Sequence, residues 1–191
     1  MKKFMIVLVC FVQHLLASSC NFNVKVKQIL ENEGFHRNIT YEVVFNKDER
    51  QQVDLYKHCI LGIDQTLPAG VYVNPNELSD LRRVLRVHAI PKNHVNVELP
   101  TEQSYPSSVY IIGRIMGRRV TMWVPVHARY HKAVSGGGMA TNIIDRPKLY
   151  LRCPDRRLDQ CEKQKSPSVI MLCNGGTKEK CSWLEVPHVT V

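Results

Sequence analysis

The first nineteen residues place the strongest constraint on where this chain folds, because their residue types are arranged as in a cleaved secretory signal peptide. Two lysines precede an apolar run from Phe4 to Ala17, and small residues follow it. A positive end, a short apolar core and a small-residue exit are typical of such signals. The run is shorter than the roughly 20 apolar residues that cross a bilayer. We therefore expect residues 1–19 to be a signal peptide and residues 20–191 to form one luminal domain; a buried N-terminal helix is the alternative.

Export to an oxidising compartment determines how the cysteines are interpreted. Six cysteines remain after the signal and predict up to three disulfides. Two intervals of eight residues favour the local bridges Cys153–Cys161 and Cys173–Cys181, although pairing across the two segments fits the spacing equally well. No C-x2-C pair occurs, which disfavours a zinc site built from thiolates. The disulfide candidates are Cys20, Cys59, Cys153, Cys161, Cys173 and Cys181.

Short β-like segments predominate in the rest of the chain, and turns rich in Gly, Pro, Asp and Asn separate many of them. The alternation of strands and helices that marks nucleotide-binding folds is missing. We expect a mostly β, antiparallel, sandwich-like single domain with one short helix, braced by disulfides. The predicted strands are residues 22–26, 40–45, 109–112, 120–126, 143–144, 149–153, 169–173 and 183–189.

One helix is predicted directly after Asn74. Asn74 can cap it, Pro75 occupies the first helical position, and Glu77 stands three residues past the cap, as in a capping box. Leucines then recur at helical spacing for about three turns, with arginines toward the C-terminal end.

The Asn38-Ile39-Thr40 triplet is an acceptor for N-glycosylation, and it lies in a polar stretch, residues 31–40. Such triplets arise often by chance. Beside a secretory signal, however, the triplet predicts a glycan on Asn38.

Two histidines provide the most conspicuous side chains for chemistry, since His127 and His131 flank Arg129. If a strand continues through them, their imidazoles lie about 13 Å apart, too far for one metal ion. We expect His127, Arg129 and His131 to form one polar side of a strand, with Tyr130 on the other side. No G-x-S-x-G motif or paired carboxylates occur. We therefore predict no catalytic residue, no metal and no cofactor.

A basic surface suggests an alternative function. Without Lys2 and Lys3, the 26 Lys and Arg become 24 against 17 Asp and Glu, a net charge of +7. Such a surface could bind polyanions such as heparin-like glycans. Export makes a nucleic acid partner improbable, and the basic residues are dispersed along the chain.

Two segments stand out as motifs: a first box, residues 67–78 (LPAGVYVNPNEL), and a second box, residues 124–131 (VPVHARYH). The first is similar to an L-P-x-G-x-aromatic-aliphatic-acid/amide-P run, and the second to a V/L-P-V-H-x-R-Y-H run. Both runs belong to the PIG-X family, which this chain therefore resembles; its members are the luminal stabilising subunits of glycosylphosphatidylinositol (GPI) mannosyltransferase I. The resemblance extends from about residue 50 to the end of the chain. Its motif residues are Leu67, Pro68, Gly70, Pro75, Pro125, His127, Arg129, Tyr130, His131 and Trp183.

The resemblance implies a non-catalytic role in GPI-anchor biosynthesis on the luminal side of the endoplasmic reticulum. The implied partner is a PIG-M-type multi-pass mannosyltransferase, which adds the first mannose. Family members carry an apolar helix after this domain, whereas the sequence stops at Val191. We expect attachment to the membrane through the partner or a missing C-terminal helix. The alternatives are a secreted basic glycan-binding module and a secreted hydrolase that uses His127 or His131.

Overall fold

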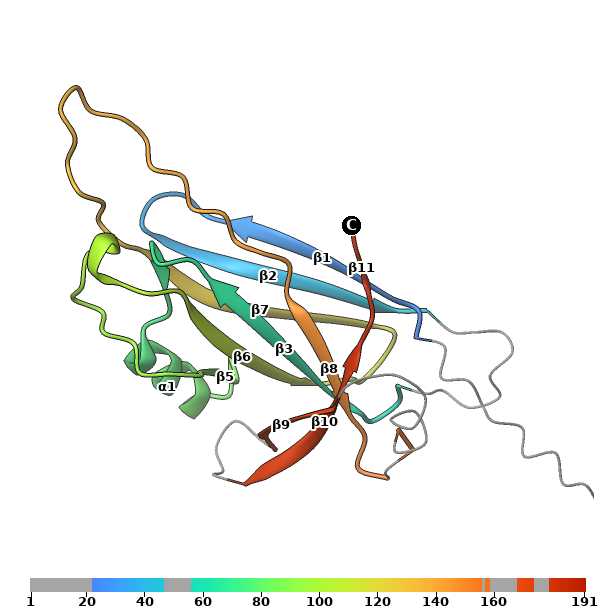
Figure 1. Cartoon of the computed structure of the whole chain (residues 1–191). Helices are drawn as coiled ribbons and strands as arrows, with labels where there is room; N and C mark the ends of the chain where they lie inside the picture. Colours follow the sequence, from blue (N-terminus) through green and yellow to red (C-terminus); the bar gives the residue numbers. More distant parts are fainter. Residues whose placement is uncertain (1–21, 47–55, 156, 159–167, 174–178) are drawn as a thin grey trace, which may run out of the picture.

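Strands are the predominant secondary structure in the computed structural model, which describes residues 22–46, 56–155, 157–158, 168–173 and 179–191. Within these ranges the chain forms two curled sheets and one α-helix (Figure 1). The predicted mostly β, antiparallel fold with one short helix is therefore confirmed. The predicted signal peptide, residues 1–19, and the candidates Cys20 and Cys161 lie outside the described residues.

The first sheet has the strand order β11-β1-β2-β7-β4. Its neighbours pair antiparallel, except that β11 runs parallel to β1. β1 shows the period of two expected of a half-buried strand, with Val24 and Val26 buried and the lysines between and after them exposed. The strands are β1 (Val24–Glu31), β2 (His36–Phe45), β4 (Val71–Tyr72), β7 (Arg119–Ala128) and β11 (Val189–Thr190).

The second sheet has the strand order β5-β6-β3-β8-β10-β9, and every neighbouring pair is antiparallel. Its inner face shares one apolar core with the first sheet. The strands are β3 (Ile60–Leu67), β5 (Ala89–Pro91), β6 (Ser107–Arg114), β8 (Lys148–Arg152), β9 (Ser168–Leu172) and β10 (Lys180–Val186).

A smaller apolar cluster covers part of the second sheet. Trp183 of β10 is fully buried there with Tyr150 and Met171. Its ring lies so close to β3 that a Cβ on Gly62 would come within 3.2 Å of the indole. Glycine at position 62 therefore lets the Trp183 indole pack against β3. This contact gives the family-motif residue Trp183 a packing role.

The single helix, α1 (Pro75–Arg83), begins where the sequence predicts. The Asn74 side chain accepts from the backbone N–H of Asn76 at 3.0 Å, and Pro75 occupies the first turn. Leu78 is the buried contact of the helix with the core. A short 3-10 turn, η1 (Thr101–Gln103), lies at the end of the sheets where α1 also lies (Figure 1). The described part of the chain contains no helix with the length and hydropathy of a bilayer-spanning segment.

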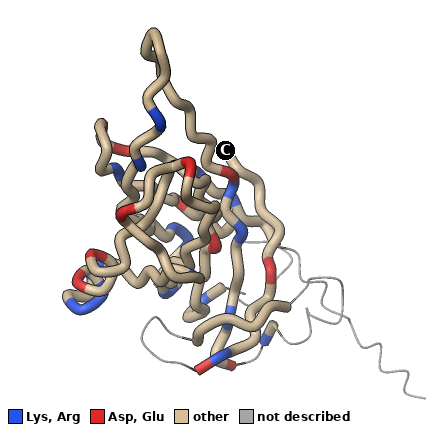
Figure 2. The backbone as a smooth tube through the Cα atoms, turned by 60° about the vertical axis from the view of Figure 1, so that its left-hand side comes forward, with Lys and Arg blue, Asp and Glu red and all other residues tan. Residues whose placement is uncertain are grey.

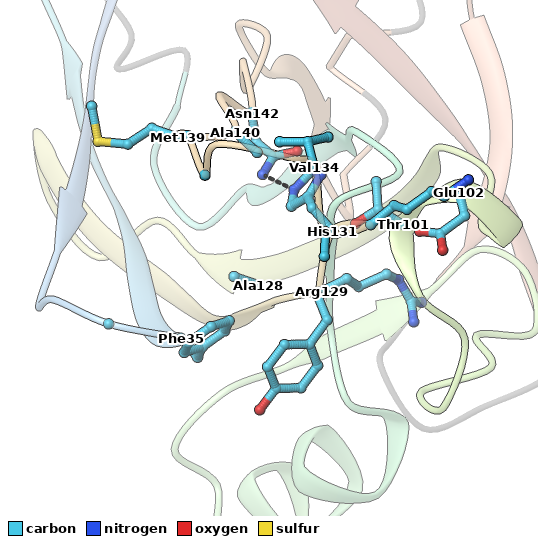
Figure 3. Close-up of a pocket in the computed structure, with 16 residues that line it drawn as sticks. Phe35, Thr101, Glu102, Ala128, Arg129, His131, Val134, Met139, Ala140 and Asn142 are labelled. Carbon is cyan, nitrogen blue, oxygen red and sulfur yellow. Dashed lines mark hydrogen bonds between the residues drawn. The ribbon is translucent and has the colours of Figure 1, made fainter.

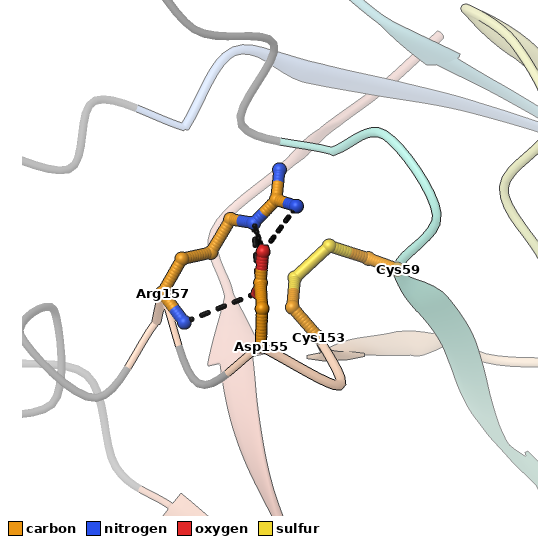
Figure 4. Close-up of a disulfide and its surroundings, with 4 residues drawn as sticks. All are labelled: Cys59, Cys153, Asp155 and Arg157. Carbon is orange, nitrogen blue, oxygen red and sulfur yellow. Dashed lines mark hydrogen bonds and ion pairs between the residues drawn. A yellow bond between two sulfur atoms is a disulfide. The ribbon is translucent and has the colours of Figure 1, made fainter.

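Two disulfides join described cysteines, and only one of them matches the predicted local pairing. Cys173 pairs with Cys181, as expected, whereas Cys153 pairs with Cys59 and not with Cys161 (Figure 4). Cys59 precedes β3 and Cys153 follows β8, and these strands are neighbours with Ile60 opposite Arg152. The spacing of eight residues could not reveal this contact, because sheet pairing across 94 residues creates it.

One predicted strand is wrong, and one strand of the core lies outside the prediction. Residues 143–144 belong to the extended but unpaired connection between β7 and β8. The strand β3 was not predicted, because Gly62, Asp64 and Gln65 interrupt its apolar pattern. The structure buries β3 between β6 and β8, where Asp64 and Gln65 are enclosed despite their polarity.

Candidate functional site

The first and second boxes meet at one end of the two sheets. β4, within the first box, pairs with the end of β7, so that Tyr72 lies opposite His127. Beyond the pairing, the Arg129 backbone N–H donates to the Gly70 carbonyl at 2.8 Å. Sequence similarity singles out both segments, and the structure brings them into direct contact. We treat this junction and the pocket beside it as the candidate functional site.

Arg129 holds the junction to a neighbouring loop. Its guanidinium donates from Nη1 to the Leu99 carbonyl at 2.7 Å and stacks over the Tyr72 ring at 4.4 Å. The residue is buried, and burial lowers the pKa of the guanidinium from its ordinary value, while the Tyr72 hydroxyl partly offsets this. A planar cation with several donors suits such a simultaneous contact with a carbonyl and an aromatic face.

The expected polar strand over residues 127–131 is wrong beyond Ala128. β7 ends at Ala128, after which Arg129 turns inward while Tyr130 and His131 are exposed. The Arg129 backbone N–H still donates to the Gly70 carbonyl in the register of the β4–β7 pairing, whereas its guanidinium turns to the Leu99 carbonyl.

His127 and His131 have separate partners. The His127 Nε2 atom lies 2.7 Å from Glu77 Oε2, and the His131 Nε2 atom lies 3.2 Å from Asn142 Nδ2. A third imidazole, that of His36, lies 3.1 Å from the second oxygen of Glu77. His36, Glu77 and His127 are thus a group of metal-ligand side chains assembled from three elements.

The Glu77 carboxylate contacts His36 and His127 and does not complete the expected capping box. Glu77 stands three residues past the helix cap, but the contacts of its carboxylate are with the two imidazoles. The cap itself is supplied by Asn74. Sequence spacing placed Glu77 correctly in the first turn and could not show which neighbouring element it faces.

Gly70 permits a close approach between the first box and the connection from β7 to β8. A Cβ at Gly70 would lie 2.1 Å from Oδ1 of Asn142, so any larger residue would displace that side chain. Asn142 also contacts His131, and it therefore links the connection to both boxes.

An open pocket of about 860 Å³ lies beside the junction (Figure 3). Phe35 and Tyr130 form part of its wall with ring centroids 5.1 Å apart, and their exposed fractions are 56% and 75%. Val134 and Met139 of the β7–β8 connection also line it and are exposed. This connection projects from the end of the sheets in Figure 1. Exposed apolar side chains around a hollow indicate a surface suited to binding another molecule.

The remaining motif residues have packing positions. Leu67 is fully buried, the Pro68 carbonyl accepts from the Val71 N–H in a turn at 3.0 Å, and Pro75 starts α1. Pro125 lies opposite Asn38 in the pairing of β2 with β7. Because β4 pairs with β7 only at the last two residues of β7, Pro125 has a strand on one side only, where proline is tolerated.

Asn38 lies within β2 and is half-buried, next to the buried Ile39. Its side chain therefore points to the outer face of the first sheet, where alternation places it. Glycosylation of Asn38 stays a prediction.

Charged residues are mixed along the described chain. Figure 2 shows Lys and Arg interspersed with Asp and Glu in this view, including on α1, where Asp80 and Arg83 form an ion pair at 3.0 Å.

Sequence reasoning missed Phe35, His36 and Leu99. None of them lies in a motif, and each joins the site through a long-range contact: Phe35 with Tyr130, His36 with Glu77, and Leu99 with Arg129.

Comparison with known proteins adds an independent line of evidence. Residues 32–190 match the family described as PIG-X / PBN1. Three similar proteins are each called "GPI alpha-1,4-mannosyltransferase I, stabilizing subunit", and each match covers 170 residues and 87% of this chain. The identity is 28% for the protein of Homo sapiens, 26% for that of Mus musculus and 25% for that of Rattus norvegicus. The matches cover 64%, 65% and 66% of those proteins, so the chain spans somewhat less than two thirds of their length. Because the family match extends over most of the sequence and includes both boxes, this chain belongs to the PIG-X / PBN1 family.

Proposed function

We propose that this chain is a non-catalytic stabilising subunit of GPI mannosyltransferase I in the endoplasmic reticulum. Its partner is a PIG-M-type multi-pass mannosyltransferase, which adds the first mannose during GPI-anchor biosynthesis. The observation that carries the proposal is the family match over residues 32–190, together with the function named for the three relatives.

The way in which the motif side chains are used supports a binding role. Arg129 contacts backbone carbonyls and the Tyr72 ring, and Gly70 makes room for Asn142. These contacts shape and support the end of the domain from which the β7–β8 connection projects. The luminal domain begins after the predicted signal peptide, residues 1–19, and the Cys59–Cys153 and Cys173–Cys181 disulfides fit the oxidising lumen.

The contact surface in this proposal is the apolar rim of the pocket, made by Phe35, Tyr130, Val134 and Met139. Its occupant is an apolar luminal segment of the mannosyltransferase. All four side chains are more than half exposed in the chain by itself, and covering them would remove apolar surface from water.

Gene disruption tests the function. Cells that lack the endogenous gene should lose the mannosyltransferase protein and display fewer GPI-anchored proteins at the surface. Re-expression of this chain, with any segment that follows it in the natural protein, should restore both quantities. Unchanged transferase abundance and unchanged surface display after disruption would refute the proposed function.

A double variant tests the contact surface in the same cells. F35S/Y130S should reduce co-precipitation of the mannosyltransferase, because it removes the aromatic pair from the rim. Ile170→Ser is the matched control, since Ile170 is 74% exposed on β9, in the other sheet. Equal co-precipitation by the double variant and the control would show that the rim is not the contact surface.

A further inference from the structure

Three side chains of types that ligate metals in other proteins converge where the two boxes meet. His36 is the first residue of β2, Glu77 is in the first turn of α1, and His127 is near the end of β7. One ligand atom from each lies within 4.8 Å of the other two. No element contributes more than one of them, so only the tertiary fold creates the group.

The two imidazoles are brought together by strand register. His36 and His127 are directly opposite in the antiparallel pairing of β2 with β7. Directly opposite residues have Cβ atoms about 5 Å apart and share one face of the sheet. Their rings accordingly stack, with centroids 4.6 Å apart and an angle of 15° between the planes.

Two of the three side chains are held in place by their surroundings. His127 is covered on its other side by the Tyr72 ring, with centroids 5.1 Å apart. The capped first turn of α1 directs Glu77 toward the sheet, where its two oxygens lie 2.7 Å from His127 Nε2 and 3.1 Å from His36 Nε2. The His36 side chain is 59% exposed and has room to adjust.

The ligand set suits zinc. Two imidazoles and one carboxylate, with a fourth position left to water, form a tetrahedral zinc site in several proteins. With bonds of about 2.0–2.1 Å, a tetrahedral ion separates its ligand atoms by roughly 3.3 Å. Glu77 contacts the imidazoles through different oxygens, Oε2 at 2.7 Å from His127 Nε2 and Oε1 at 3.1 Å from His36 Nε2. The group is therefore as compact as a zinc site, and one Glu77 oxygen has to turn to face the ion together with both imidazoles. Binding would require the His36 ring to tilt, so that both Nε2 lone pairs point at one ion.

We propose that His36, Glu77 and His127 bind one Zn²⁺ ion, which ties α1 to β2 and β7. This site is independent of the proposed function, because it concerns the domain alone and needs no partner. In the metal-free chain, the imidazoles hydrogen-bond to the Glu77 carboxylate. In the zinc-bound chain, both Nε2 atoms are unprotonated ligands, and the proton of each neutral ring is on Nδ1.

Direct titration tests the site. The mature chain, purified without a histidine tag and treated with a chelator, should bind one Zn²⁺ in isothermal titration calorimetry. His36→Ala and Glu77→Gln should each weaken binding by roughly tenfold or more, because each removes a ligand. His131→Ala is the matched control, since His131 is an exposed imidazole that contacts Asn142 outside the group, and it should bind zinc like the natural chain.

Two further measurements separate loss of the site from loss of the fold. Co²⁺ should give the visible absorption of a tetrahedral site in the natural chain and in His131→Ala, but not in His36→Ala. Circular dichroism should be the same for all of these proteins, because His36 is exposed. Absence of zinc binding by the natural chain, or equal zinc affinity in His36→Ala and Glu77→Gln, would overturn the proposal and leave the three side chains as a hydrogen-bonded contact only.

Discussion

Removal of the Cys59–Cys153 disulfide should destabilise the domain far more than removal of Cys173–Cys181. The first bridge joins residues 94 positions apart, and the second joins residues 8 positions apart. A disulfide restricts the unfolded chain more strongly when it closes a longer loop. Comparing the two removals also compares Cys59–Cys153, which the cysteine spacing did not suggest, with Cys173–Cys181, which it did.

The magnitude follows from loop length. The chain-entropy relation gives about 4.7 kcal/mol for the loop closed by Cys59–Cys153 and about 2.6 kcal/mol for the loop closed by Cys173–Cys181. The double variants C59A/C153A and C173A/C181A lose the same atoms, so the loss of sulfur itself affects both. We therefore expect a difference of about 2 kcal/mol in the free energy of unfolding.

Guanidinium denaturation under non-reducing conditions measures this difference. Tryptophan fluorescence can follow unfolding, because Trp183 is fully buried in the native chain. Both variants should unfold in a single transition with similar dependence on denaturant. The reasoning is refuted if C173A/C181A loses as much stability as C59A/C153A, or more.

Three other substitutions test local features. Asn74→Ala should lower the free energy of unfolding by about 1 kcal/mol through loss of the helix cap, as measured by denaturation. Arg129→Lys should cost about 1.5–3 kcal/mol in the same assay, because an ammonium cannot keep both the Leu99 hydrogen bond and the stacking on Tyr72. Burial, followed by the charges of Glu185 and Asp64, raises the pKa of Tyr150 from 10.0 to about 12, so its contribution to stability is complete below pH 10 and is lost as the pH rises through 12. Tyr150→Phe should therefore lessen the loss of stability measured between about pH 10 and 12.

Local signals in the sequence predicted the elements that depend on neighbouring residues. The helix begins at Pro75 because the Asn74 side chain and the proline act within one turn. β2, β7 and β8 are recognisable from runs of apolar and β-branched residues. The spacing of eight residues agrees with the Cys173–Cys181 bridge, although the same spacing favoured Cys153–Cys161, which does not form.

Features that depend on sheet pairing were not predictable in this way. β3 contains glycine and polar residues, and only its position between β6 and β8 makes it a strand of the core. Arg129 lies just past the end of β7, and its side chain turns to the Leu99 carbonyl, which is 30 residues away in the sequence. The Cys59–Cys153 bridge depends on the pairing of β3 with β8.

The amino-acid sequence by itself determined the mostly β character, the short helix and the two boxes that mark the family, because each of these is written in the order of nearby residues. Only the tertiary structure decided that the boxes touch, that Phe35 joins Tyr130 at the pocket, and that His36 and His127 face one carboxylate. The physical reason is that strand register and loop closure bring distant residues together, and the spacing of residues along the chain does not encode these distances.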